Sequence, residues 1–158
     1  MSEANPLRIF VSHNFAEGDD YLRLFEFLES MEQFFYVNVS DPENIPTLGG
    51  LEAIKQELVK QIKASEIVIL VPELYEATAA PIQFMMEVAE ANSIGMIALR
   101  PYGGLSDIPE EIVNRVKALV DWNARMIVDS ILQVARGEET SRWEVLDFPG
   151  FEPDASNE

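Results

Sequence analysis

The chain has 158 residues, with 28 acidic and 11 basic side chains and a formal net charge of −17. Nucleic acids and anionic lipid surfaces are bound through clustered Lys and Arg, so this charge argues against both as partners. The net charge does not exclude the binding of one small anionic ligand, because local backbone donors can outweigh the overall field. The chain has no Cys and a single His, which excludes disulfides, thiol chemistry and the usual zinc sites.

The hydropathy of the chain also bears on its location. No segment reaches the roughly 20 uninterrupted apolar residues of a membrane span, and residues 1–6 lack the basic-then-apolar pattern of an export signal. We therefore expect a cytoplasmic protein. The length suits one domain with a single hydrophobic core.

The first predicted element is a strand within residues 8–15 that runs directly into Ser12, His13 and Asn14. Its β-branched and aromatic residues, followed by an amphipathic helix over residues 18–31, are typical of the first βα unit of an α/β domain. Ligands of open parallel sheets bind beyond the carboxyl ends of the strands. These three polar side chains are therefore the first site candidates.

The rest of the chain continues to alternate between strands and helices. Residues 67–71 are apolar at every position, which is typical of a central strand covered on both faces. The other expected elements are, in chain order, a strand over 34–39, a punctuated loop over 41–50, a helix from 51, a helix over 81–91, a strand over 95–99, a short helix after 109, a strand over 118–120 and a last helix after 123.

This alternation predicts a flavodoxin-like three-layer α/β/α fold with a five-stranded parallel sheet in the order 2-1-3-4-5. We assign residues 1–136 to this domain and residues 137–158 to an acidic C-terminal tail, whose aromatic residues indicate that it docks somewhere. On this topology the segments that follow the strands meet at one edge of the sheet. They are 12–15, 38–41, 72–75 and 100–103.

Glu87 lies nearly two turns into the predicted third helix, beside the face that we expect to be buried. A carboxylate at this place can reach a ligand over the sheet edge, or it can be an ordinary solvated helix residue. Two other candidates also have a structural alternative. His13 can be a hydrogen-bonded structural residue, and Asn123 can be the N-cap of the last helix.

Familiar chemistries of this fold do not match the chain. A phosphoacceptor receiver domain needs an acidic pair after the first strand, an Asp after the third and a Lys near the fifth. Residues 12–14, 72–73 and 121–123, which occupy these places, do not supply them. A flavin-phosphate loop is disfavoured because residues 16–20 are acidic and would repel a phosphate. The chain also has neither a dinucleotide glycine fingerprint nor a P-loop.

Four segments together resemble a known family. They are 9–13, 61–71, 87–91 and 120–123 with Ile127. Their residues, order and spacing are similar to those of bacterial TIR-like domains, of the type found in the sensor subunit of Thoeris anti-phage systems. The resemblance covers residues 7–136 and implies the flavodoxin-like fold already expected.

For active members, the resemblance also implies cleavage of the N-glycosidic bond of NAD, with release of nicotinamide and hydrolysis or cyclisation of the ADP-ribose. NAD is then a substrate, and no resident cofactor or metal is expected. Glu87 occupies the position of the family's essential glutamate, which can hold the ribose hydroxyls and stabilise positive charge at the anomeric carbon. Loss of the pyridinium needs no proton donor, so one carboxylate can suffice. The residues that would line the nucleotide pocket are Phe10, Ser12, His13, Asn14 and Asn123.

Self-association is also implied, with the loop over residues 40–50 mobile over the site and packed against a neighbouring subunit. Two departures from the family pattern keep a second hypothesis open. Gln83 stands where members often have Trp, and Ala79 and Ala80 stand where they often have Ser. A non-catalytic TIR-like module, which binds proteins or holds a nucleotide without cleaving it, is the alternative.

Overall fold

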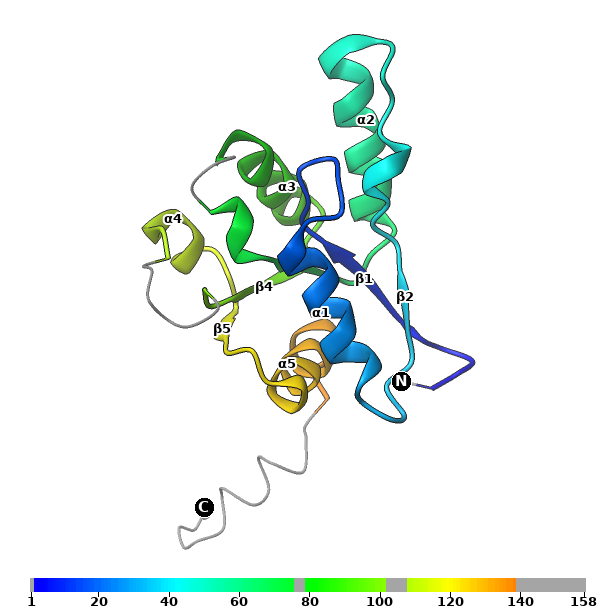
Figure 1. The fold of residues 1–158 in the computed structure, drawn as a ribbon, viewed down its shortest axis with the longest axis vertical. Coiled ribbons are helices and arrows are strands. Elements are labelled where there is room, and N and C mark those ends of the chain that lie inside the picture. Colours follow the sequence, from blue (N-terminus) through cyan, green and yellow to red (C-terminus); the bar gives the residue numbers. More distant parts are fainter. Residues whose placement is uncertain (1, 76–78, 102–107, 139–158) are drawn as a thin grey trace, which may run out of the picture.

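A five-stranded parallel sheet runs through the middle of the molecule (Figure 1). The computed structural model describes residues 2–75, 79–101 and 108–138. The strands are β1 (Leu7–Val11), β2 (Tyr36–Asn38), β3 (Ile67–Leu70), β4 (Gly95–Leu99) and β5 (Ala118–Val120). Their order is β2-β1-β3-β4-β5, and each neighbouring pair is parallel. The predicted fold class and strand order are confirmed.

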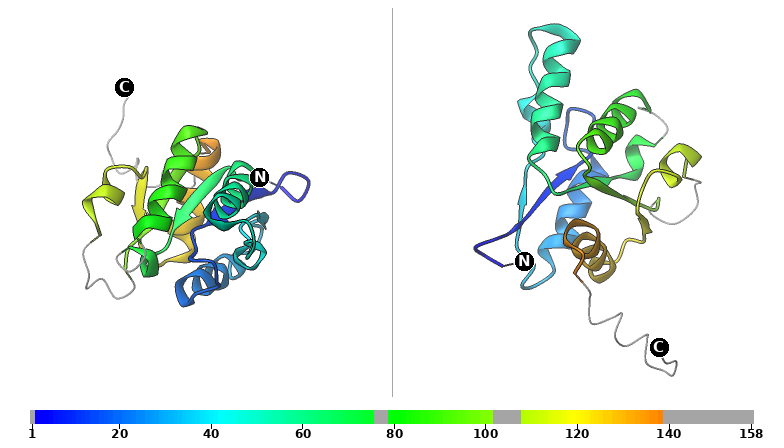
Figure 2. Two further views of the ribbon diagram at one scale, coloured as in Figure 1. Left: turned by 90° about the horizontal axis from the view of Figure 1, so that it is seen from above. Right: turned by 180° about the vertical axis from the view of Figure 1, so that it is seen from behind.

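Helices cover both faces of this sheet (Figure 2). The helices are α1 (Asp19–Glu29), α2 (Gly50–Lys63), α3 (Ala79–Ala91), α4 (Glu110–Val113) and α5 (Ala124–Arg136), with 3-10 turns η1 (Pro42–Asn44) and η2 (Pro72–Leu74). On one face α1 packs against α5, and on the other α2 packs against α3. The N-terminal half of α2 projects beyond the rest of the molecule in Figure 1.

The hydrophobic core lies on both sides of β3, whose four residues are all fully buried. β3 pairs with β1 and β4, so its backbone groups are satisfied on both edges while its side chains pack on both faces. The helices bury residues at three- and four-residue steps. Examples are Tyr21, Leu24 and Leu28 in α1, and Ile82, Met85, Met86 and Ala89 in α3, the face expected from the sequence.

The edge strand β2 is shorter than the sequence predicts. The apolar run suggested residues 34–39, but pairing with β1 covers only Tyr36 to Asn38. Gln33, in the turn before this run, adopts a left-handed backbone conformation with a φ of 63°. Phe34 is instead buried in the core. Apolar residues at this place therefore reflect packing under the edge of the sheet as well as strand formation.

The first part of the loop between β2 and α2 is tied to α2. Gln61 accepts a hydrogen bond from the Asp41 N–H (2.9 Å) and donates one to the Asp41 carbonyl (3.0 Å), and Pro42 is buried. By contrast, Thr47 and Leu48 are exposed at the tip of α2. The loop is thus fixed at its start and presents an apolar side chain to solvent near its end.

The turn after β3 and the start of α1 cap each other. The Glu73 carboxylate accepts hydrogen bonds from the N–H groups of Asp20 and Tyr21 (3.3 Å each), and the Asp20 carboxylate accepts one from the Glu73 N–H (3.0 Å). Gly18 allows this contact, because a Cβ there would clash with the Glu73 carboxylate. Arg23 pairs with Asp20 at 2.6 Å and offsets the local negative charge.

Within the three described ranges of the chain, no helix combines the length and the apolar character that crossing a membrane requires. Two of the sequence predictions concern residues outside these ranges. They are the part of the 100–103 segment from residue 102 onward, and all of the acidic tail after residue 138.

Candidate functional site

A cleft of about 440 Å³ lies between α2 and α3, on the face of the sheet that these two helices cover. Its volume is within the range of small-molecule sites, which is about 300 to 1,000 Å³. The lining is largely apolar with a few polar groups. The lining residues are Phe15, Leu51, Ile54, Lys55, Leu58, Pro81, Gln83, Phe84 and Glu87.

Glu87 is an exposed residue of α3 and lines this cleft. One turn earlier, Gln83 donates a hydrogen bond to the Glu111 carboxylate (2.8 Å), which holds the Gln83 amide toward α4. Arg115 lies nearby and is bound by Glu90 at 2.6 Å. The hydrogen bond that Arg115 donates to Glu90 raises the pKa of Arg115, and the charge of Glu87 adds to that rise. The Glu87 carboxylate is therefore open to a ligand and lies within the field of a guanidinium.

Two aromatic rings and one cation share the cleft with this carboxylate. Phe15 comes from the loop after β1, and Phe84 comes from α3. The Lys55 ammonium of α2 lies over the Phe84 ring, 5.5 Å from its centroid. Such a contact stabilises a cation on an aromatic face. The cleft thus combines flat apolar surfaces, one ammonium and one carboxylate.

Ser12 and His13, which the sequence predicts at a ligand crevice, are buried. The Ser12 hydroxyl oxygen accepts a hydrogen bond from the Val71 N–H (3.0 Å), so it joins the ends of β1 and β3. Phe10 is fully buried in the core, whereas Asn14 is exposed. None of these four lines the α2–α3 cleft, although Asn14 directly precedes Phe15, which does.

His13 is 1% exposed and packs against three aromatic rings. Its Nδ1 atom accepts a hydrogen bond from the Phe15 N–H (3.2 Å). Among the described residues, its Nε2 atom makes no hydrogen bond. Burial lowers the pKa of His13 to about 4, against smaller opposing effects of Gln61 and Asp41. The imidazole is therefore neutral near pH 7.

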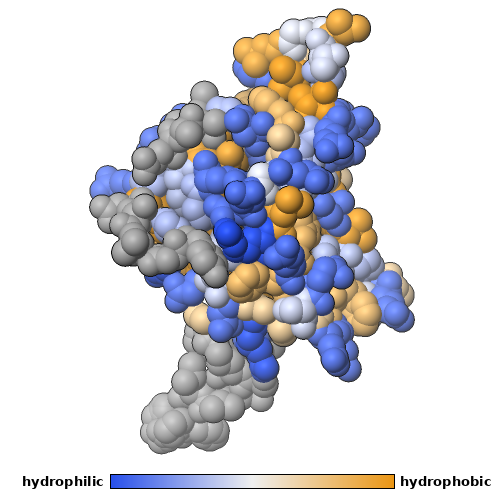
Figure 3. Space-filling view, viewed as in Figure 1, coloured by the Kyte–Doolittle hydropathy of each residue, from blue (hydrophilic) through white to orange (hydrophobic). Residues whose placement is uncertain are grey.

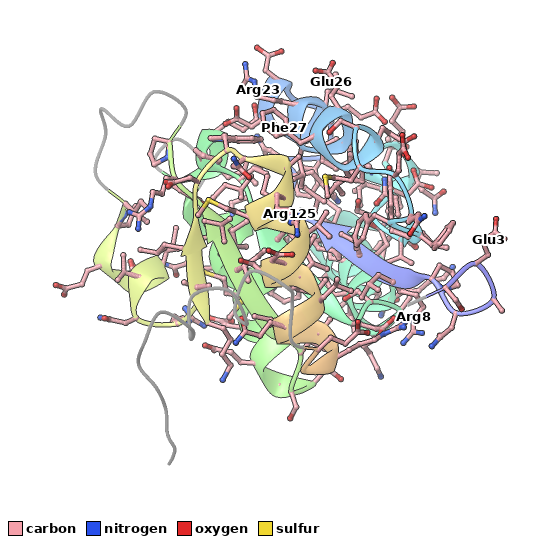
Figure 4. All side chains as sticks on the ribbon, turned by 90° about the horizontal axis from the view of Figure 1, so that it is seen from below. Glu3, Arg8, Arg23, Glu26, Phe27 and Arg125 are labelled. Atoms are coloured by element: carbon pink, nitrogen blue, oxygen red, sulfur yellow. The ribbon has the colours of Figure 1, made fainter. Side chains whose placement is uncertain are left out.

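Asn123 caps the last helix. Its side-chain oxygen accepts a hydrogen bond from the Met126 N–H (3.0 Å), the contact that a helix N-cap makes. The neighbouring Trp122 donates its indole N–H to the Arg100 carbonyl (2.8 Å) and packs against Phe27 of α1. Phe27 and Arg23 lie on the side of α1 that Figure 4 shows. Asn123 is not among the residues that line the α2–α3 cleft.

The structure thus brings Glu87 together with Phe15, Lys55 and Phe84, three residues that sequence reasoning did not single out. Phe15 belongs to the 12–15 segment that was expected at the crevice, so its place in the chain was a usable signal. Lys55 carried a weaker signal, because a basic residue interrupts the apolar face of the predicted second helix. Phe84 carried no such signal in the sequence, because helical spacing cannot distinguish a residue in a cleft wall from a residue in the core.

Comparison with known proteins leaves the family open. No protein-family model matches the chain, and no curated protein is significantly similar to it. Within the described ranges, no group of three or more His, Asp or Glu side chains is arranged to hold a metal ion. The fold defines the chain as a flavodoxin-like α/β protein, and any assignment of activity depends on the cleft.

Proposed function

We propose that the chain is a TIR-like domain that binds NAD or a related nucleotide in the α2–α3 cleft and cleaves its N-glycosidic bond. The observation that carries this proposal is the Glu87 carboxylate, which is exposed and lines a cleft that also contains two aromatic rings and an ammonium. The resemblance of the sequence to bacterial TIR-like domains supports the same residue.

The cleft offers a complementary group for each part of a dinucleotide. Phe15 and Phe84 provide surfaces on which planar bases can stack. Lys55 makes no ion pair with any described residue, so its charge is free for a diphosphate in a molecule whose net charge is −17. The Glu87 carboxylate can accept hydrogen bonds from the ribose hydroxyls.

The reaction needs only one such carboxylate. The bond between the anomeric carbon and the pyridinium nitrogen breaks, and both electrons leave with nicotinamide, which is neutral. Glu87 stabilises the positive charge that develops on the ribose. Water then adds to the anomeric carbon and loses a proton to give ADP-ribose, or a nucleophilic atom of the ADP-ribose itself adds to give a cyclic product.

We propose the following biological setting on the same grounds. The protein acts in the cytoplasm, where NAD is present, as a signalling component of anti-phage defence. It self-associates through the loop over residues 40–50. The apolar side chains of Leu48 and Leu51, which are 84% and 66% exposed, support such a contact.

A non-catalytic TIR-like module is the second candidate. Two observations favour it. Ser12 and His13 are buried and bonded within the protein rather than open to a ligand. Gln83 is hydrogen-bonded to Glu111 and offers no aromatic ring to a substrate. On this hypothesis the cleft holds a nucleotide or a protein segment without reacting.

Turnover of NAD by matched variants tests the proposal. Purified protein is incubated with NAD, and nicotinamide is measured by chromatography. We expect release by the wild type and a loss of about 100-fold or more in Glu87→Gln, because the charge at the developing cation is removed. Glu26→Gln is the control, since it makes the same change on an exposed residue of α1 (Figure 4).

Calorimetry with NAD separates the two candidates. NAD binding by the wild type without nicotinamide release, or no NAD binding at all, supports the non-catalytic module. Turnover that is equal in the wild type and Glu87→Gln contradicts the assignment of Glu87.

A further inference from the structure

The backbone of Phe15 is in a conformation that needs an explanation. Its φ is 66°, in the left-handed region that bulky residues rarely adopt. Such a conformation persists when surrounding contacts determine it, and it occurs often at ligand sites. Phe15 lines the α2–α3 cleft, so whatever fixes its backbone also fixes part of the cleft wall.

His13 contacts both the backbone and the ring of Phe15. Its Nδ1 atom accepts a hydrogen bond from the Phe15 N–H at 3.2 Å, and the two rings pack edge to face with centroids 6.3 Å apart. A ring nitrogen accepts a hydrogen bond only when it carries no proton. The observed geometry therefore requires the neutral imidazole with its proton on Nε2.

The surroundings of His13 favour this form. Phe10 of β1 and Tyr21 of α1 pack against the ring, with centroids 5.5 Å and 6.4 Å away. Gln61 of α2 and Asp41, which precedes η1, are the polar groups that face it, and Asp41 is the charged one. Burial outweighs their effect and lowers the pKa of His13, so the acceptor is present at neutral pH.

We propose that His13 is a positioning residue whose unprotonated Nδ1 holds Phe15 in its left-handed conformation and thereby keeps the Phe15 ring in the wall of the nucleotide cleft. The ligand part of this inference rests on the proposed function. His13 then acts on the ligand through Phe15 and does not touch it. Protonation of Nδ1 replaces the acceptor with a donor that faces the Phe15 N–H, so the hydrogen bond is lost and the cleft wall is released.

The first test needs no ligand. The chain has one histidine, so the imidazole nitrogens can be followed by NMR without ambiguity. We expect an unprotonated Nδ1 at pH 7, and a Phe15 amide signal that moves with the same midpoint as the imidazole when the pH is lowered. A protonated Nδ1 at pH 7, or a Phe15 amide that does not follow the imidazole, overturns the proposal.

The second test uses variants and NAD. His13→Asn keeps a side-chain acceptor near the position of Nδ1 and does not titrate, whereas His13→Leu removes the acceptor. We expect His13→Leu to weaken NAD binding about tenfold, which is the effect of one lost hydrogen bond, and to leave kcat nearly unchanged. His13→Asn should restore binding. Equal affinities of wild type and His13→Leu overturn the proposal.

A double-mutant cycle shows whether His13 acts through Phe15. In the Phe15→Ala background the ring is already absent, so His13→Leu should have no further effect on NAD affinity. An additional loss there means that His13 touches the ligand, and overturns the proposal. If the wild type neither binds nor cleaves NAD, the proposed function fails, and the NMR titration alone decides the role of His13.

Discussion

At the scale of single residues, burial has its clearest electrostatic consequence at His13. Its pKa is about 4 in the folded protein, against 6.5 for an exposed histidine. Between these two values the unfolded chain binds a proton that the folded protein does not bind. The free energy of unfolding therefore falls as the pH falls through this window, and it is unaffected by His13 above pH 6.5. Across the whole window the free energy of unfolding falls by about 3 kcal/mol, because each unit of pKa difference corresponds to about 1.4 kcal/mol.

Denaturant unfolding at several pH values checks this effect. We expect the wild type to lose about 2 to 3 kcal/mol more than His13→Asn between pH 7 and pH 4, because asparagine does not titrate. The carboxylates titrate in both proteins, so the difference between the two curves reports His13. Parallel curves would mean that the imidazole is solvated in the folded state.

At the scale of elements, Arg136 joins three parts of the fold. At the end of α5 its guanidinium donates two hydrogen bonds of 2.8 Å to the Glu66 carboxylate, which precedes β3. It also donates to the backbone carbonyls of Asn5 (3.1 Å) and Pro6 (3.0 Å), which precede β1. The hydrogen bond from Arg136 is the main reason that the pKa of Glu66 is lowered. This pair is therefore most stabilising above the ordinary pKa of a glutamate, and its contribution is lost as the pH falls.

Removal of this guanidinium should destabilise the fold measurably. We expect Arg136→Gln to lower the free energy of unfolding by about 1.5 to 3 kcal/mol at pH 7, because the pair is bidentate and largely shielded from solvent. Arg125→Gln is the control on the same helix, since Arg125 is exposed and lies 3.9 Å from Asp129. Its effect should be below about 0.5 kcal/mol. Similar losses in both variants would refute a special role for Arg136.

The elements also show which features a sequence can reveal. The fully apolar run at Ile67–Leu70 predicts a central strand because a strand buried on both faces needs apolar residues at every position. The turn η2 was not predicted, because it depends on mutual capping between Glu73 and Asp20, 53 residues apart. Residues distant in sequence leave no periodic signal for such a contact.

The candidate site was only partly accessible for the same reason. Glu87 was singled out by its place beside the buried face of the predicted third helix together with the resemblance to TIR-like domains, and the structure puts it at a cleft. The burial of Ser12 and His13 was not predictable, because some of their partners come from other elements. Gln61 of α2 and Tyr21 of α1 face His13, and Val71 after β3 donates to Ser12. The cleft itself is a product of how α2 packs on α3, and periodicity within each helix cannot report it.

At the scale of the whole molecule, net charge and exposed apolar surface oppose each other. The net charge of −17 repels a second copy at long range. Apolar side chains nevertheless gather at the tip of α2 (Figure 3), where Leu48 and Leu51 are exposed. Salt screens the repulsion, with a Debye length of about 10 Å at 0.1 M, and leaves the apolar contact intact. Self-association should therefore strengthen as the ionic strength rises.

Sedimentation velocity at low and high salt measures this balance. For the wild type, we expect a larger share of dimers or higher oligomers at roughly 0.5 M NaCl than at roughly 0.02 M NaCl. Leu48→Asp should be a monomer under both conditions. Leu22→Asp is the control, because Leu22 is also exposed but lies on α1. A wild type that stays monomeric in high salt would argue against the α2 tip as a contact between subunits. Equal dissociation by both variants would place the contact elsewhere, because only Leu48→Asp puts a charge at the tip.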